Sequence, residues 1–254
     1  MRQRLPSFII GGAPRCGTTW LYHLADRHPK IYMARPVAPE PKFFLLDDLY
    51  QKGLAHYAGQ WFGNAPTGAL LGEKSTNYLE NAVVAQRLGR DLPDVRLIFV
   101  LRNPIDRAFS NYLWSCQNGL ETESFDKALE LEGRRCREQP ERWRYSQPFS
   151  YLRRGLYDEL LKPWLEQFSR SRLLILIYEA MLADPTGTAA KLHTFLGVPE
   201  RPEDGLGLGP INAVHNPERV CMRPETRQWL ATYYAASNRR LRAVLRAPIV
   251  EWDA

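Results

Sequence analysis

The residues best suited to chemistry form a glycine turn near the amino terminus, Gly12-Ala-Pro-Arg-Cys-Gly-Thr-Thr19. The turn follows an apolar run and precedes an amphipathic stretch, as at the junction of a buried strand and a helix. Backbone N–H groups and the helix dipole at such a junction bind anions. The spacing matches the phosphate loop G-x-x-x-x-G-K-[ST], except that Thr18 replaces the lysine. The pattern predicts a phosphate site, and an ordinary glycine turn is the alternative.

The missing lysine indicates which phosphate this loop would hold. Without it, nothing in the loop bridges the β- and γ-phosphates of a nucleoside triphosphate, which argues against an ATPase. The basic group lies upstream, at Arg15. A single 5'-phosphate fits better, with Thr18 and Thr19 donating hydrogen bonds and Arg15 reaching over the leaving oxygen.

A second candidate site follows the apolar run Leu97-Ile-Phe-Val-Leu101. Arg102 comes next, Pro104 stands near the favoured first position of a helix, and Ser110 follows two turns later. A guanidinium at the end of a strand can bind phosphate through its planar fork, and a hydroxyl adds a neutral hydrogen bond. We therefore predict a second phosphate site at Arg102 and Ser110.

The elements that must position these residues alternate along the chain. Apolar segments predict strands and amphipathic segments predict helices. Strands that are apolar throughout and alternate with helices predict a parallel sheet covered on both faces, with ligands beyond the carboxyl ends of the strands. The expected fold class is α/β: a single domain, residues 1–254, with a P-loop-like central parallel sheet flanked by helices. The expected strands are 8–12, 70–73, 95–101 and 173–178, and the expected helices are 18–27, 81–92, 104–117, 125–137, 151–169, 186–196 and 224–245.

The composition fits this fold and excludes several classes of protein. The chain has 254 residues, 44% hydrophobic and 24% charged, which suits one globular domain. No run approaches the ~18 apolar residues of a membrane helix, and the amino terminus lacks the apolar core of a signal peptide. We expect a cytoplasmic protein without a membrane span.

Cysteines and charges add two further expectations. The four cysteines lie far apart without a C-x-x-C pair or zinc spacing, which favours free thiols over two long-range disulfides and predicts no metal site. The net charge of +6 comes with arginine-rich stretches, which we interpret as mostly solvated helix faces rather than a nucleic-acid surface.

Together these motifs resemble the PAPS-dependent sulfotransferases, where PAPS is 3'-phosphoadenosine-5'-phosphosulfate and PAP is the product nucleotide. Pro14 to Trp20 resembles their 5'-phosphosulfate loop, and Leu97 to Tyr112 resembles their 3'-phosphate motif. Ile175 to Met181 is similar to a third block. The similarity spans most of the chain in order and spacing, and it implies transfer of a sulfuryl group from PAPS to an acceptor hydroxyl or amine without a metal.

The resemblance implies donor contacts residue by residue. Arg102 and Ser110 would hold the 3'-phosphate. Tyr178 is a candidate for contact with the base, and a core tyrosine is the alternative. Cys16 would be a thiolate favoured by the helix terminus and Arg15, and a buried inert thiol is the alternative. The residues implied on the 5' side and adenine are Arg15, Cys16, Gly17, Thr18, Thr19 and Trp20.

Glu40-Pro-Lys-Phe-Phe44 and Gly72-Glu-Lys-Ser-Thr-Asn-Tyr78 are similar to the heparan-sulfate branch of this family and its bacterial relatives. There, the glutamate before the double phenylalanine is the proposed base. The resemblance implies that Glu40 is the general base and that Arg15 and Lys74 stabilise the leaving phosphate. Lys42 would assist or bind the acceptor.

The histidines have no context that matches the histidine base of the steroid and phenol branches. We expect His23, His28 and His56 to be ordinary surface or helix residues.

The chain also departs from the heparan-sulfate branch. Arg15 stands where that branch usually has lysine. The glycine- and lysine-rich loop that clamps the donor is replaced by His215-Asn-Pro-Glu-Arg-Val-Cys-Met222. Arg219 and His215 are the candidates to take over its phosphate contact.

Two other functions remain open. A P-loop kinase or NTPase needs the Walker lysine and an aspartate for magnesium, and neither is well placed. A non-catalytic nucleotide- or nucleic-acid-binding module leaves Glu40 and Lys74 without a role.

For a sulfotransferase, segments 47–64 and 132–149 are expected to line the acceptor site. The acceptor could be a small molecule, a lipid, a carbohydrate or a carrier-bound intermediate, and the oligomeric state is open.

Overall fold

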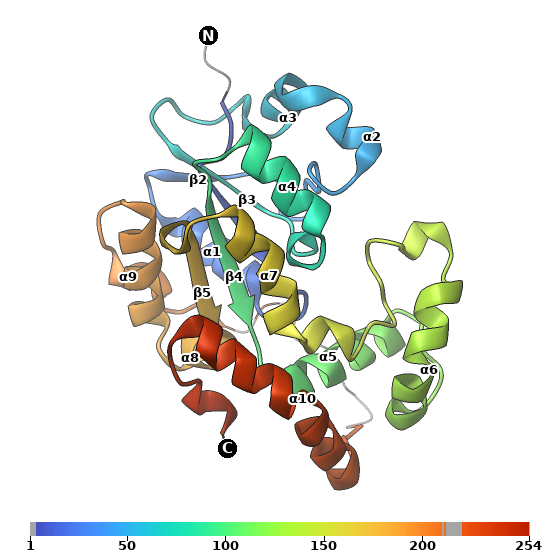
Figure 1. The fold of residues 1–254 in the computed structure, drawn as a ribbon. Helices are drawn as coiled ribbons and strands as arrows, with labels where there is room; N and C mark the ends of the chain where they lie inside the picture. Colours follow the sequence, from blue (N-terminus) through green and yellow to red (C-terminus); the bar gives the residue numbers. More distant parts are fainter. Residues whose placement is uncertain (1–3, 210, 212–219, 254) are drawn as a thin grey trace. The chain divides into compact units, whose positions relative to one another are not determined.

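Parallel strands form one sheet in the order β2-β3-β1-β4-β5 (Figure 1). The computed structural model describes residues 4–209, 211 and 220–253. Within it the chain divides into two units: Met1–Leu101 with Pro163–Ile211, and Arg102–Lys162 with Asn212–Ala254. All the strands belong to the first unit: β1 (Phe8–Gly12), β2 (Ile31–Met33), β3 (Leu70–Lys74), β4 (Arg96–Leu101) and β5 (Leu173–Ile177). Assignment of residues 1–254 to one domain stays a prediction.

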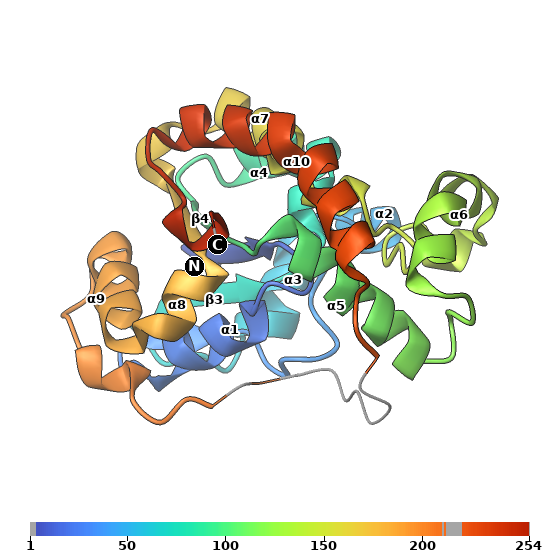
Figure 2. The ribbon, with the colours of Figure 1, turned by 90° about the horizontal axis from the view of Figure 1, so that it is seen from below.

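The central strand of this parallel sheet is apolar on both faces, as is typical of parallel sheets. Every residue of β1 is buried, and β1 pairs with β3 on one side and β4 on the other. Such strands must be covered by helices on both sides. Helix α1 (Thr18–Arg27) lies on one face and α4 (Ala82–Asp91) on the other, as the two views show (Figures 1 and 2). The predicted α/β class with a helix-flanked parallel sheet is confirmed.

Most predicted elements of the first unit are present, and three further elements were not predicted. The additional elements are β2, α2 (Asp47–Tyr50) and α3 (Gly53–Phe62). Strand β2 has too few residues to show a period. The other helices of this unit are α8 (Tyr178–Ala183) and α9 (Pro185–Leu196), with short 3₁₀ turns at Tyr78–Glu80, Arg170–Arg172 and Pro202–Gly205. No helix among the described residues has the length and apolar character to span a membrane.

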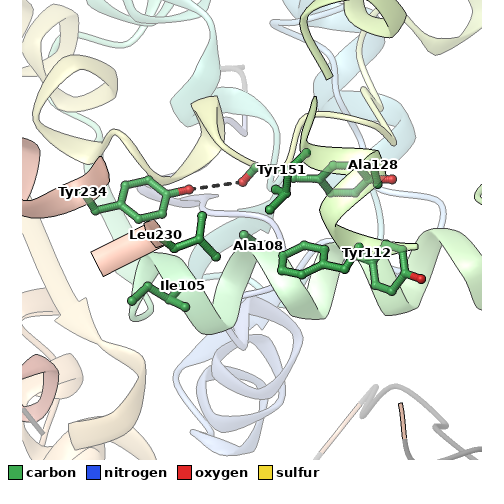
Figure 3. Close-up of a cluster of buried hydrophobic side chains, with 9 residues drawn as sticks. Ile105, Ala108, Tyr112, Ala128, Tyr151, Leu230 and Tyr234 are labelled. Atoms are coloured by element: carbon green, nitrogen blue, oxygen red, sulfur yellow. Dashed lines mark hydrogen bonds between the residues drawn. The ribbon is translucent and has the colours of Figure 1, made fainter. Parts of the chain in front are cut away.

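The second unit is helical and has its own core. It contains α5 (Pro104–Gln117), α6 (Phe125–Glu138) and α10 (Pro224–Leu245), with 3₁₀ turns at Glu141–Trp143, Arg153–Gly155 and Val250–Trp252. Helix α7 (Tyr157–Gln167) begins here and continues into the first unit. Figure 3 shows side chains of α5, α6 and α10 meeting around Tyr151, whose carbonyl oxygen accepts a hydrogen bond from the Tyr234 hydroxyl (3.4 Å).

The predicted helix 151–169 is wrong at its start, because α7 begins only at Tyr157. The backbone N–H groups of Tyr151, Leu152 and Arg153 donate to the Glu132 carboxylate at 3.0, 2.6 and 3.1 Å. A buried carboxylate on α6 therefore takes donors that a helix starting at 151 would leave without partners. This capture is a long-range contact that local periodicity does not reveal.

We predict that Glu132→Ala lowers the free energy of unfolding by roughly 2–5 kcal/mol, because it leaves buried N–H groups without an acceptor. Glu130→Ala on the same helix is the matched control. Its carboxylate is exposed and forms a surface pair with Lys127, so its loss should cost under about 0.5 kcal/mol. Urea denaturation of both variants makes the measurement, and equal losses would contradict a special role for Glu132.

Candidate active site

The glycine turn joins β1 to α1 with a geometry that requires glycine at one position. Gly17 caps α1 with φ of 81°, in the left-handed region. A Cβ at Gly17 would lie 2.8 Å from two ring carbons of Tyr178 and 3.0 Å from Met181 Cε. Both the backbone conformation and the packing therefore exclude a side chain here.

The amino terminus of α1 is suited to an anion. The first turn of the helix contains no acidic residue, and within the described residues no side-chain hydrogen bond caps it. Its leading N–H groups have no intrahelical acceptor, and the dipole adds partial positive charge. Thr18 is buried at the first helical position, and Thr19 is half-buried beside it. The structure thus brings the predicted threonines to the predicted kind of site.

The other loop residues lie in the turn with different exposures. Arg15 is half-buried at φ 67°. The Cys16 thiol is fully buried and donates to the Pro14 carbonyl oxygen at 3.6 Å, which favours the inert-thiol alternative. The buried Trp20 indole N–H donates to the Leu208 carbonyl oxygen at 3.3 Å. None of the four cysteines forms a disulfide in the part of the chain that the structure describes, in agreement with the expectation of thiols.

Lys74 connects the phosphate loop to Glu40. Its Nζ lies 2.5 Å from Glu40 Oε1 and 3.5 Å from Thr19 Oγ1. The ion pair is largely buried, with side-chain exposures of 6% for Lys74 and 12% for Glu40. The predicted base, the predicted cation and one predicted phosphate-binding threonine are therefore in one place.

Thr76 and Ser75 hold the Glu40 segment, and their roles were not predicted. Thr76 donates to the Glu40 carboxylate through its backbone N–H (3.1 Å) and its hydroxyl (3.0 Å). The Ser75 hydroxyl accepts the backbone N–H of Lys42 at 2.9 Å. Both residues follow β3 directly, so their position at the carboxyl end of a strand was the available signal.

Tyr178 begins α8 instead of ending the strand, which corrects the predicted strand 173–178. Its ring packs where a Cβ of Gly17 would be, so Tyr178 forms one wall of the phosphate loop. This packing is compatible with either of the two roles considered for it.

The second predicted phosphate site belongs to the other unit. Arg102 directly follows β4, and its backbone is fixed by Tyr157, whose hydroxyl donates to the Arg102 carbonyl oxygen at 2.9 Å. Asn103 caps α5 by accepting the Ile105 N–H at 3.0 Å, and Pro104 is the first helical residue, as predicted. Ser110 is buried on the same helix.

The structure corrects the prediction for His28 and does not describe the two residues proposed to close over the donor. His28 is not a surface residue: it is fully enclosed, its Nδ1 accepts the Lys30 N–H at 3.1 Å, and its Nε2 lies 3.0 Å from the Pro199 carbonyl oxygen. Arg219 and His215, the candidates for donor closure, lie outside the described residues.

Glu73, which precedes Lys74 on β3, is a buried acid that the sequence analysis did not single out. It has no exposed surface, and its Oε2 accepts the Tyr57 hydroxyl at 2.6 Å. Burial raises the pKa of Glu73 to about 7; hydroxyl hydrogen bonds oppose the rise, and the negative charge of Glu40 adds to it. A glutamate in the middle of a predicted strand, directly before the candidate Lys74, was the signal in the sequence.

Among the described residues, no group of three or more His, Cys, Asp or Glu side chains is arranged to hold a metal ion. The absence of a metal from the reaction stays a prediction.

Comparison with known proteins identifies the class. A model of the sulfotransferase domain matches residues 5–206. Mouse heparan sulfate glucosamine 3-O-sulfotransferase 6 is 30% identical over 197 residues, which cover 78% of this chain and 54% of that protein. The chain therefore belongs to the sulfotransferase domain family, and it spans about half the length of the curated relatives it matches.

Solved structures agree on the fold. A sulfotransferase from Alicyclobacillus acidocaldarius superimposes with a TM-score of 0.80 at 27% identity, covering 99% of this chain and all of the other. Mouse sulfotransferase SULT7A1 complexed with PAP gives a TM-score of 0.61 at 16% identity, covering 93% of this chain and 85% of its own. The second likeness shows the fold alone.

We predict that Glu73→Gln removes a pH dependence of stability. The folded-state pKa of Glu73 is raised from 4.5 to about 7, so folding favours the protonated form. The wild type should be most stable at a pH below 4.5, the pKa of Glu73 in the unfolded chain. Its free energy of unfolding should fall by roughly 3 kcal/mol as the pH rises through the folded-state pKa of about 7. The glutamine variant lacks this loss, so the stability difference between the two proteins should widen from pH 5 to pH 8.

Urea denaturation at several pH values makes this measurement. Glu130→Gln, which replaces an exposed carboxylate, should follow the wild type. A stability difference between Glu73→Gln and the wild type that stays constant with pH would contradict a buried acid of raised pKa.

Proposed function

We propose that this protein transfers the sulfuryl group of PAPS to an acceptor hydroxyl or amine by in-line displacement at sulfur. The observation that carries the proposal is the position of Lys74 Nζ, 2.5 Å from Glu40 Oε1 and 3.5 Å from Thr19 Oγ1. One cation thus lies between a carboxylate and the phosphate loop. Sulfuryl transfer needs such a combination, because a proton must leave the acceptor while charge builds on the leaving phosphate.

In the proposed reaction, the Glu40 carboxylate takes the proton of the acceptor O–H or N–H. The acceptor atom forms its bond to sulfur as the bond from sulfur to the bridging phosphate oxygen breaks. PAP leaves with that electron pair, and Arg15 and Lys74 stabilise the negative charge on its oxygen. Lys42 assists Lys74 or binds the acceptor.

The ion pair also suggests how donor binding prepares the base. Without a donor, the Lys74 ammonium pairs with Glu40, and Thr76 donates two further hydrogen bonds to the carboxylate. A bound phosphosulfate would attract Lys74 toward the loop, where Thr19 already lies within reach. The Glu40 carboxylate would then lose its ion pair and could accept the proton of the acceptor.

The donor contacts in this proposal follow the sequence motifs. Arg102 and Ser110 hold the 3'-phosphate, and Tyr178 is the candidate for the base. Arg219 and His215, which lie outside the described residues, stay the two candidates for closure over the donor. The 5' side is bound by Arg15, Cys16, Gly17, Thr18, Thr19 and Trp20, with Cys16 contributing through its backbone because its thiol is buried.

The acceptor is proposed by class. The related mouse protein is named for glucosamine units of heparan sulfate, which supports a carbohydrate hydroxyl among the acceptors considered. A small molecule, a lipid and a carrier-bound intermediate remain the other classes of acceptor.

A kinase or NTPase is disfavoured because Thr18 occupies the lysine position of the Walker loop. A cytoplasmic location stays a prediction.

We predict that Glu40→Gln lowers kcat for PAPS turnover by about 10²- to 10⁴-fold while PAP affinity changes little. The amide keeps the shape of the side chain and loses proton acceptance. PAP release, followed by chromatography with water as the acceptor, gives the rate, and calorimetry gives the affinity. Asp94→Asn, which removes an exposed carboxylate of the same unit, should leave both unchanged.

Retention of more than half of the wild-type kcat by Glu40→Gln would exclude Glu40 as the base. A glutamate that only supports its loop would instead weaken PAP binding and stability together.

We predict that Arg102→Ala weakens PAP binding by a few kcal/mol, about 10²-fold, because a charge-assisted bidentate contact is lost. Binding of adenosine 5'-phosphosulfate, which has no 3'-phosphate, should change much less. Arg134→Ala is the control, since Arg134 is exposed on α6 and forms only a long surface pair with Glu138. Equal losses for both nucleotides would show that Arg102 has a structural role alone.

A further inference from the structure

Tyr157 contacts both backbone polar groups of Arg102, the residue proposed to bind the 3'-phosphate. Its hydroxyl donates a hydrogen bond to the Arg102 carbonyl oxygen at 2.9 Å and accepts one from the Arg102 N–H at 3.4 Å. The N–H belongs to the peptide group before the Cα atom of Arg102, and the carbonyl belongs to the peptide group after it. One hydroxyl therefore restrains both of the planar groups that set the direction in which the Arg102 side chain leaves the backbone.

The chain directly after Arg102 is also held in place. Asn103 caps α5 with its side chain, and its carbonyl oxygen accepts the Arg107 N–H at 2.8 Å. Pro104 has a restricted φ at the first position of the helix. Helix α5 therefore begins with a well-defined backbone, and the Tyr157 hydroxyl extends this order back to Arg102.

The Tyr157 ring is placed by packing within the second unit. Tyr157 is the first residue of α7 and has no exposed surface, and the Trp252 ring lies against it with the centroids 5.9 Å apart. The 3₁₀ turn before it approaches the start of α5 so closely that a Cβ on Gly155 would lie 2.8 Å from Pro104 Cβ. A buried ring and a close-packed turn thus direct the hydroxyl toward Arg102.

We propose that Tyr157 is a positioning residue that makes this site selective for a 3'-phosphate, because its hydroxyl holds the Arg102 backbone in the orientation that the phosphate contact needs. A bidentate contact requires two N–H groups of the guanidinium to align with two phosphate oxygens. A fixed starting point for the side chain lowers the cost of ordering it on binding. The proposal rests on the function proposed above and assigns Tyr157 no contact with the nucleotide.

The test compares PAP with adenosine 5'-phosphate, two nucleotides that differ only in the 3'-phosphate. Calorimetry gives the dissociation constant of each, and the ratio of the two constants measures the selectivity for the 3'-phosphate. Tyr157→Phe keeps the buried ring and removes the hydroxyl. It should weaken PAP binding about 10-fold, while binding of adenosine 5'-phosphate should change by less than about 2-fold.

Tyr112→Phe is the matched control. The Tyr112 hydroxyl also donates to a backbone carbonyl of the second unit, that of Glu123 at 2.9 Å, and Tyr112 lies on α5. Its loss removes the same kind of hydrogen bond at a position away from Arg102, so the selectivity should stay at the wild-type value.

Combination of Tyr157→Phe with Arg102→Ala shows whether Tyr157 acts through Arg102. Without the guanidinium, Tyr157→Phe should cause no further loss of selectivity, so the effects of the two substitutions should not add. A purely structural role would weaken binding of both nucleotides by the same factor in either background, and this result would contradict the proposal.

Hydrogen exchange of the wild-type protein adds a measurement that needs no variant. The Arg102 N–H should exchange far more slowly than that of an exposed residue, because its acceptor is a buried hydroxyl. Exchange at the rate of an exposed amide, or wild-type selectivity in a folded Tyr157→Phe, would overturn the role of Tyr157 and leave the proposed function intact. Failure of the wild-type protein to bind PAP would overturn the proposed function and this role with it.

Discussion

Lys74 can reach both Glu40 and the phosphate loop because β1 and β3 are hydrogen-bonded neighbours in the sheet. Their register pairs Ile10 with Lys74, so β3 ends beside the last residues of the strand that leads into the loop, two residues before β1 ends at Gly12. The cation is thus placed by backbone pairing, and a slip of one residue would turn it to the other face. A buried ion pair is costly to desolvate, and here Thr76 supplies the additional hydrogen bonds that such a pair needs.

The two glutamates near the end of β3 are in opposite environments. Glu40 contacts an ammonium and receives two hydrogen bonds from Thr76, whereas Glu73 is buried beside the Tyr57 hydroxyl, and this burial raises the pKa of Glu73 to about 7. The two carboxyl groups therefore lie near the same strand end in chemically different surroundings.

The sequence predicted those features that depend on local pattern. The apolar runs predicted most of the strands, and the glycine spacing predicted the loop before α1. The resemblance of two short motifs indicated that Glu40 and Lys74 belong to one site, and in the structure they form an ion pair. It did not predict contacts made by one side chain with a distant backbone. Glu132 takes the N–H groups that would start a longer α7, and Tyr178 fills the space beside Gly17. Such contacts have no period, so only the folded chain reveals them.

We propose that this P-loop-like site binds a 3'-phosphorylated nucleotide and not a nucleoside triphosphate. The most direct test is calorimetric titration of the wild-type protein with PAP and with ATP, each with and without magnesium. We expect PAP to bind with an affinity that magnesium leaves unchanged, because the proposed site assigns no carboxylate to a metal, and we expect ATP to bind far more weakly. Tight, magnesium-dependent binding of ATP with none of PAP would contradict it.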